Sequence, residues 1–274
     1  NDRTSKNKRS IKQKTTGQEC VDKDLIRRDI GMSFFELCVK LKAEVVCYVH
    51  PFSYFIKKRN YDQLKNFFSH YRLKSSYVFS SSVFNTKRTP FPIALSVFFR
   101  DKRGTSWEFL QRFSYRILGT NFALIPEKIE TCDGYIQKYG SKDCTSETGL
   151  FFFNFRDLNS LITNGAFSEQ TNCRDYIPIK ATEFYKYAYL NSLKHHWSPE
   201  EELSYVFGNF SPICRKEDLE DEDYQALFMA DAIIHNYKKI KQLDFRNKNS
   251  FVVCFGIVER ILKTTRWNLG EKFR

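Results

Sequence analysis

Apolar and polar positions alternate in short runs along the first two thirds of the chain. The segment "SSYVFSSSVF" (75–84) alternates small polar with apolar residues, which predicts a half-buried strand. The segment "FPIALSVFF" (91–99) is a continuous apolar run, typical of a strand that is covered on both faces. The run "LFFFNF" (150–155) predicts a second buried strand, and 44–49 a shorter one.

A helix is expected between the two buried strands. Thr105 and Glu108 have the spacing of a capping box, and Gly119 stands where a left-handed helix end belongs. The segment "EKIET" (127–131) then predicts a short strand that ends just before Asp133. Residues 60–73 fit either a helix or a loop with a short strand.

The period becomes helical from residue 181 onward, with Ser198 as an N-cap and Pro199 at the first helical position. We therefore expect an α+β fold, with a mixed sheet flanked by helices over 21–180 and a helical region over 181–274. Residues 1–20 are polar and basic, which predicts a disordered tail.

Composition excludes a disordered chain and favours a polyanionic partner. Of the 274 residues, 42% are hydrophobic and 16% aromatic, while the formal net charge is +12. The phosphates of nucleic acid attract such a positive charge, although a basic surface that serves only solubility would also explain it. No stretch approaches the 18 apolar residues of a membrane span, so we expect no membrane partner. The eight cysteines favour reduced thiols in an intracellular protein over disulfides in a secreted one.

The order of the expected elements is that of an RNase H-like domain. The segment "FPIALSVFFRDKRGTSWEFLQRF" resembles the "FPIA…SW.WFL" stretch of Mutator-like element transposases, and "IETCDGY" resembles the "I.TDG" that follows it. The resemblance covers roughly residues 60–160. It implies an RNase H-like fold, descent from a transposase and a nuclear location.

In that family, carboxylates hold two Mg²⁺ or Mn²⁺ ions for strand transfer. The resemblance places the second carboxylate at Asp133 and the first at Asp62. The chain departs from the family elsewhere: Phe152 and Phe155 stand where a Cys and a His are usual, and the third carboxylate has no identifiable position. We therefore expect the catalytic site to be eroded, with Asp62 and Asp133 binding metal only if it is active.

Basic residues lie in turns around the expected sheet, where they could reach a phosphate backbone. Aromatic residues interleaved with them (Tyr54, Tyr61, Phe67, Tyr71 and Tyr77) could stack on unpaired bases or belong to the core. The expected nucleic-acid-binding residues are Lys57, Lys58, Arg59, Arg72, Lys74, Lys87, Arg88, Arg100, Lys102 and Arg103.

Two other clusters of polar residues carry weaker signals. His195 and His196 with Cys173 and Cys214 could form a zinc site, but their spacing matches no known zinc motif and adjacent helical residues point apart. The acidic run from Glu217 to Asp223 predicts a solvated loop, with partner docking as the alternative.

The sequence thus favours a DNA-binding protein, with RNA as a second possibility, built on a retired transposase core that acts with protein partners or as a homodimer in a nuclear complex. One alternative is an active Mg²⁺- or Mn²⁺-dependent nuclease or transposase. Another is a non-catalytic scaffold subunit, because a fold alone does not specify a function.

Overall fold

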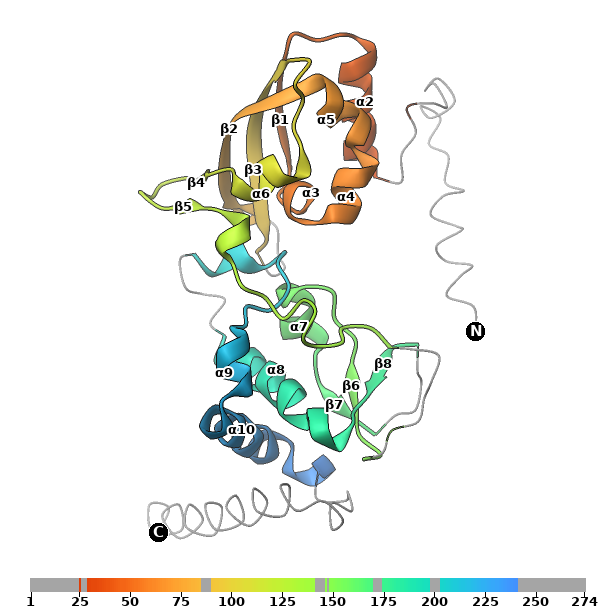
Figure 1. Cartoon of the computed structure of the whole chain (residues 1–274), viewed down its shortest axis with the longest axis vertical. Coiled ribbons are helices and arrows are strands. Elements are labelled where there is room, and N and C mark those ends of the chain that lie inside the picture. Colours follow the sequence, from red (N-terminus) through yellow and green to blue (C-terminus); the bar gives the residue numbers. More distant parts are fainter. Residues whose placement is uncertain are drawn as a thin grey trace. The chain divides into compact units, whose positions relative to one another are not determined.

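The computed structural model divides the chain into two compact units (Figure 1). Unit 1 takes the residues up to Tyr77 together with Ala94–Leu124, and unit 2 takes Val78–Ile93 and the residues from Ile125 onward. Both combine a sheet with helices, so the expected α+β class is confirmed. The described residues are 25, 29–84, 90–140, 146, 148–169, 174–197 and 203–240. Of residues 237–240 only the backbone is described.

Unit 1 is built on a five-stranded sheet in the order β1-β3-β2-β4-β5. Its strands are β1 (Val45–Pro51), β2 (Tyr71–Ser80), β3 (Pro92–Arg100), β4 (Tyr115–Ile117) and β5 (Ala123–Leu124). Its helices are α2 (Ile30–Lys40), α3 (Ser53–Ile56), α4 (Lys58–Gln63), α5 (Lys65–His70) and α6 (Trp107–Arg112).

One face of this sheet carries helices α2 to α5 (Figure 1). Alternate residues of β3, Ala94, Ser96 and Phe98, are fully buried on that face. The core there is aromatic: the ring of Phe67 lies 4.6 Å from that of Phe35 and 5.0 Å from that of Phe98, both edge to face. Such pairs add to the stabilisation that burial alone provides.

A chain of polar side chains crosses this core. His50 on β1 has one ring nitrogen 2.9 Å from the hydroxyl of Ser96, and that hydroxyl lies 2.9 Å from the hydroxyl of Ser76. The other ring nitrogen lies 3.0 Å from the carbonyl oxygen of Pro51. A carbonyl can only accept, so Nδ1 carries the proton and Nε2 accepts from Ser96. Burial lowers the pKa of His50 to about 4.

The expected strands of unit 1 are confirmed at 44–49 and 91–99, but the helix after them differs from the prediction. Ser106, not Thr105, caps α6 by accepting from the backbone N–H of Phe109, and the helix ends at Arg112 rather than near Gly119. The Thr105 hydroxyl is engaged elsewhere, because it donates to the Tyr71 carbonyl and accepts from the Leu73 N–H.

Two further boundaries of unit 1 differ. The strand expected over 75–84 runs from Tyr71 to Ser80 and passes into a 3-10 turn. The ambiguity over 60–73 is resolved as two short helices, 58–63 and 65–70, that are separated by a turn at Leu64 and followed by strand β2. Gly119 has a φ of 82° between β4 and β5, whose strands pair antiparallel, so its left-handed backbone serves a strand connection.

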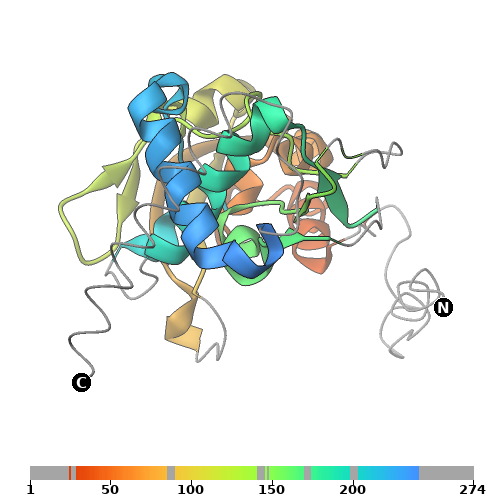
Figure 2. The same cartoon turned by 90° about the horizontal axis from the view of Figure 1, so that it is seen from below.

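Within its described residues, unit 2 combines a three-stranded sheet, in the order β7-β6-β8, with four α-helices. Figures 1 and 2 show the unit from two directions. Its buried core draws on the sheet and the helices together, with Phe152, Phe167, Phe184 and Ile233 among its members. The strands are β6 (Phe151–Phe153), β7 (Phe167–Ser168) and β8 (Tyr176–Pro178), and the helices are α7 (Leu158–Asn164), α8 (Phe184–His196), α9 (Lys216–Glu220) and α10 (Glu222–Ile240).

The buried strands expected near 91–99 and 150–155 both form, but in different sheets: β3 belongs to the five-stranded sheet and β6 to the three-stranded one. The strand expected over 127–131 is absent. Pro126 begins a 3-10 turn there, and only Thr131 forms a bridge, to Ile213.

The helical period expected from 181 is confirmed in α8 and α10, which pack against each other. The acidic run from Glu217 to Asp223 is mostly helical rather than a loop, because it contributes to α9 and the first turn of α10, with a break at Asp221. Two ion pairs brace α9, Arg215 with Asp218 and Lys216 with Glu220. The tail expected over 1–20 and the N-cap expected at Ser198 lie outside the described residues.

Among the helices of the described ranges, none has both the length and the apolar character needed to cross a bilayer.

Candidate nucleic-acid interface

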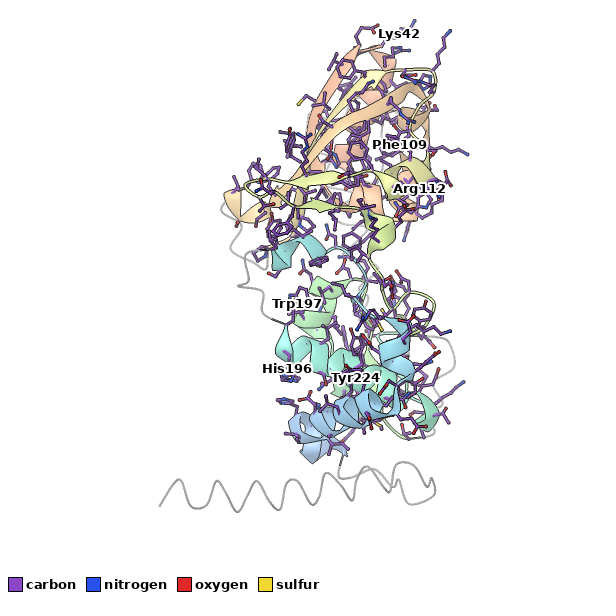
Figure 3. All side chains as sticks on the ribbon, turned by 60° about the vertical axis from the view of Figure 1, so that its left-hand side comes forward. Lys42, Phe109, Arg112, His196, Trp197 and Tyr224 are labelled. Carbon is purple, nitrogen blue, oxygen red and sulfur yellow. The ribbon has the colours of Figure 1, made fainter. Side chains whose placement is uncertain are left out.

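Strand β2 turns a row of polar and charged side chains away from helices α2 to α5. Tyr71 and Leu73 are buried, so Arg72 and Lys74, which alternate with them, point to the opposite face. The alternation shifts by one position before Ser76, which is buried, and Tyr77 therefore returns to the same outer face as Lys74. Figure 3 brings this side of the molecule forward.

Each of these positions on β2 belongs to a pair between a cation and an aromatic ring. The Arg72 guanidinium lies 3.6 Å from the centre of the Phe109 ring on α6, and it donates to the Gly104 carbonyl over 3.0 Å. The Lys74 ammonium lies 5.9 Å from the ring of Phe99 on β3. Such pairs are attractive, by roughly 0.5–1 kcal/mol at exposed sites.

The third pair joins β2 to β4. The Arg116 guanidinium lies 5.8 Å from the ring of Tyr77, and one of its N–H groups lies 3.3 Å from the tyrosine hydroxyl. Arg116 itself is exposed between buried Tyr115 and Ile117. We call the six residues of these pairs the cation–aromatic face: Arg72, Lys74, Tyr77, Phe99, Phe109 and Arg116.

Apolar residues of β3 and β1, the next two strands of the sheet, extend this face. Phe99 keeps 43% of its surface exposed, and Val45 and Val49 on β1 are 51% and 43% exposed. Large apolar side chains left at the surface beside cations are a common feature of ligand-binding surfaces. The face can therefore offer rings for stacking and positive charge for phosphates within one sheet.

Two of the basic residues expected from the sequence are held by carboxylates. Arg103 binds Asp101 through two N–H groups, and its hydrogen bonds lower the pKa of that carboxyl to about 2. Lys58 forms a close ion pair with Asp62 on the surface of α4. These cations are already neutralised, so phosphate would have to compete with a carboxylate for each of them.

Arg100 faces the helix-covered side of the sheet. Its guanidinium lies 6.0 Å from the ring of buried Tyr71, and one terminal nitrogen is buried with no hydrogen-bond partner among the described residues. It therefore lies apart from the cation–aromatic face. Arg59 on α4 and Lys102 in the turn after β3 are exposed, and Lys57 lies just before α4. Lys87 and Arg88 lie outside the described residues.

Most of the aromatic residues considered for stacking belong to the core. Tyr54, Phe67 and Tyr71 are each at most 2% exposed. Tyr61 stacks on Phe68. Tyr77 alone of this set lies on the cation–aromatic face.

The two candidate catalytic carboxylates stand in different units, and each has its own lysine. Asp62 pairs with Lys58 in unit 1. Asp133 in unit 2 lies in a turn, where it accepts from the ammonium of Lys138 and, over 2.7 Å, from the hydroxyl of Ser211. Burial alone would raise the pKa of Asp133, but these two donors hold it below the ordinary value.

The surroundings of Asp133 tie two segments of unit 2 together. Lys138 also donates to Ser211 over 2.6 Å, and the backbone N–H of Cys132 donates to the Pro212 carbonyl. The Lys138 ammonium thus occupies one side of the carboxylate where a divalent ion would bind. The Phe152 and Phe155 rings, in place of the Cys and His of the transposase pattern, are fully packed in the core.

We expect Asp133→Asn to lower the unfolding free energy of the protein by about 1–2 kcal/mol, because a charge-assisted bond to mostly buried Lys138 is weakened. Urea denaturation measures this loss. Asp62→Asn is the matched control: its lysine is 55% exposed, so the loss should stay within about 0.5 kcal/mol. Equal losses for the two variants would contradict a supporting role for Asp133.

Sequence reasoning found Arg72, Lys74 and Tyr77 but missed their partners. Phe99 was counted within a strand buried on both faces, and Phe109 within a helix. Arg116 was assigned to the helix as well. Only the true start of β4 at Tyr115 places Arg116 opposite Tyr77.

Comparison of the chain with protein-family models, with curated proteins and with solved structures finds no match.

Proposed function

We propose that the protein binds single-stranded nucleic acid through the cation–aromatic face of unit 1. The observation that carries the proposal is the row of three cation–aromatic pairs along β2, with Phe99 exposed beside Lys74. Exposed rings stack on unpaired bases, and the cations beside them reach the backbone phosphates.

The chemistry of the face favours single strands over duplexes. A duplex hides its base faces, so Phe99 and Tyr77 could stack only on bases that are already unpaired. We take DNA as the ligand, with RNA as the alternative. The net charge of +12 adds a long-range attraction that depends on salt.

The test measures the binding of fluorescent single-stranded DNA, duplex DNA and single-stranded RNA by anisotropy over a salt series. We expect Phe99→Ala to weaken single-strand binding by about 1–3 kcal/mol, the worth of one stacked base. Lys74→Gln should weaken binding to all sequences alike and flatten the dependence of log K on log salt by about 0.7.

Lys58→Gln serves as the matched control, since it removes one lysine that Asp62 already neutralises. We expect its affinity and salt slope to match those of the wild type. If Lys58→Gln and Lys74→Gln weaken binding equally, only net charge matters and the face has no special role. An absence of binding at low salt would favour a scaffold role instead.

Descent from a Mutator-like transposase is a further hypothesis, which rests on the segments 91–113 and 129–135. Under it, the chain would be a retired transposase core with an RNase H-like ancestry that acts in a nuclear complex. DNA cleavage would instead indicate an active nuclease if it required Mn²⁺ and were lost in Asp133→Ala. We expect no such cleavage, because Lys138 and Ser211 already engage both oxygens of Asp133.

A further inference from the structure

Two histidines and one aspartate converge between α8 and α10 in unit 2. The Nε2 atom of His196 lies 3.1 Å from Oδ1 of Asp231, and the Nε2 atom of His235 lies 3.3 Å from the same oxygen. The three candidate ligand atoms lie within 4.8 Å of one another. His196 stands at the end of α8, next to α10 (Figure 3).

Helical spacing explains why these residues meet. Asp231 and His235 are four residues apart on α10, and Ser192 and His196 are four apart on α8, so each pair lies on one face of its helix. The two helices pack against each other, and they turn these faces together.

The carboxylate is held in place before any ion arrives. Its second oxygen accepts a hydrogen bond from the hydroxyl of Ser192 over 2.6 Å, which leaves Oδ1 facing the two imidazoles. The ring of His235 is braced by the ring of His195, stacked on it with centres 4.1 Å apart. Metal ligands in proteins are typically oriented by such outer partners.

From this arrangement we propose that His196, Asp231 and His235 bind a Zn²⁺ ion. Two imidazole nitrogens and one carboxylate oxygen are a ligand set that Zn²⁺ accepts, whereas Mg²⁺ and Ca²⁺ prefer oxygen ligands throughout. Ligand atoms about 2.0–2.1 Å from a tetrahedral Zn²⁺ stand about 3.3 Å apart. The two nitrogen–oxygen separations, 3.1 and 3.3 Å, are close to this value.

Three protein ligands leave the fourth position of the ion for water, which is the coordination of an exchangeable or catalytic zinc site rather than a closed structural one. His196 is 69% exposed on its side chain, so solvent and small ligands can reach that position. The ion would also join the end of α8 to α10. All three ligands belong to unit 2, so the inference is independent of nucleic-acid binding by unit 1.

The test titrates the metal-free full-length chain with Zn²⁺ in a calorimeter and follows its melting temperature. We expect one tight site, and a melting temperature that rises with zinc because the ion binds the folded chain. His196→Ala and Asp231→Asn should each weaken this site by more than about tenfold, and Ser192→Ala by about 10–100-fold through the loss of an outer partner. Mg²⁺ should not replace Zn²⁺ at equal concentration.

His70→Gln is the matched control, because it removes an imidazole from α5 of unit 1 and leaves the cluster in unit 2 unchanged. Its zinc affinity should equal that of the wild type. Co²⁺ separates this site from one made by cysteines, since nitrogen and oxygen ligands give visible bands without the thiolate charge-transfer band. Zinc binding that survives Asp231→Asn, or that is lost equally in His70→Gln, would overturn the proposal.

Discussion

The unfolding free energy of the protein should fall by about 3 kcal/mol between pH 6.5 and pH 4 on account of His50 alone. Burial lowers the pKa of this histidine from 6.5 to about 4 in the folded state. In that interval the unfolded chain binds a proton that the folded chain does not, so stability declines as the pH falls. Each pH unit is worth about 1.4 kcal/mol, and the loss ends below the folded pKa.

The core around His50 explains why the ring stays neutral. It stacks on Tyr54 at 5.5 Å and meets the edge of Phe55 at 4.6 Å, so an imidazolium there would lose its hydration. Both ring nitrogens already have partners that suit the neutral form, with Nε2 accepting from Ser96. A proton on Nε2 would reverse that hydrogen bond, so the Ser96 hydroxyl would have to accept from the imidazolium and turn its own proton toward Ser76.

His50→Gln tests this assignment, because glutamine retains an acceptor for Ser96 but does not titrate. Urea denaturation at a series of pH values gives the stability difference between wild type and variant, which should shrink by about 3 kcal/mol from pH 6.5 to pH 4. His70→Gln, at the end of α5, controls for the loss of a histidine from the same unit. A stability difference between wild type and variant that stays constant over this range would contradict a buried neutral His50. So would an NMR resonance of the His50 ring that titrates near pH 6.5.

Local pattern predicted the central strand but not the connections that surround it. The run 91–99 is apolar enough to specify β3 whatever its neighbours. The α6 cap was placed one residue early because Thr105 and Ser106 are both good caps. Only the tertiary structure shows that the Thr105 hydroxyl bonds the backbone of β2. The local pattern around Pro126 likewise did not indicate that the chain forms a 3-10 turn there instead of a strand over 127–131.

The candidate sites show the same limit of local pattern. Charge along the chain found Lys74, but its partner Phe99 lies on the adjacent strand, and strand pairing is a long-range property. The adjacent histidines near 195 were noticed, whereas the partner of His196 is Asp231, which is 35 residues away. The Asp-x-x-x-His spacing from Asp231 to His235 was the signal that could have found this cluster.

We expect Gly104→Ala to be the most damaging single-methyl change in the turn after β3, with a loss of about 3–5 kcal/mol in unfolding free energy. Gly104 has a φ of 61°, which a residue with a Cβ adopts at a cost. A Cβ there would lie 2.5 Å from the Phe68 carbonyl oxygen and 3.1 Å from the Cα of Ser69. Both obstacles are backbone, so no side chain can rotate away to make room.

The crowding at Gly104 exists because this turn is attached to α5 and β2. The backbone N–H of Thr105 donates to the Phe68 carbonyl over 2.7 Å, which draws the two segments into contact. The Gly104 carbonyl then accepts from the Arg72 guanidinium. A methyl group that forces the turn outward therefore strains two hydrogen bonds and also shifts Arg72 on the cation–aromatic face.

Gly119→Ala separates the cost of a left-handed backbone from the cost of a steric clash. Its φ of 82° is also left-handed, but a Cβ there would meet nothing within 4 Å, so we expect a loss of only about 1 kcal/mol. Urea denaturation of the two variants measures the difference, and anisotropy with single-stranded DNA shows whether Gly104→Ala weakens binding while Gly119→Ala does not. Equal stability losses for Gly104→Ala and Gly119→Ala would mean that the turn after β3 moves at little cost to make room for the methyl group. Arg72 would then be held by its contact with Phe109 rather than by its hydrogen bond to Gly104.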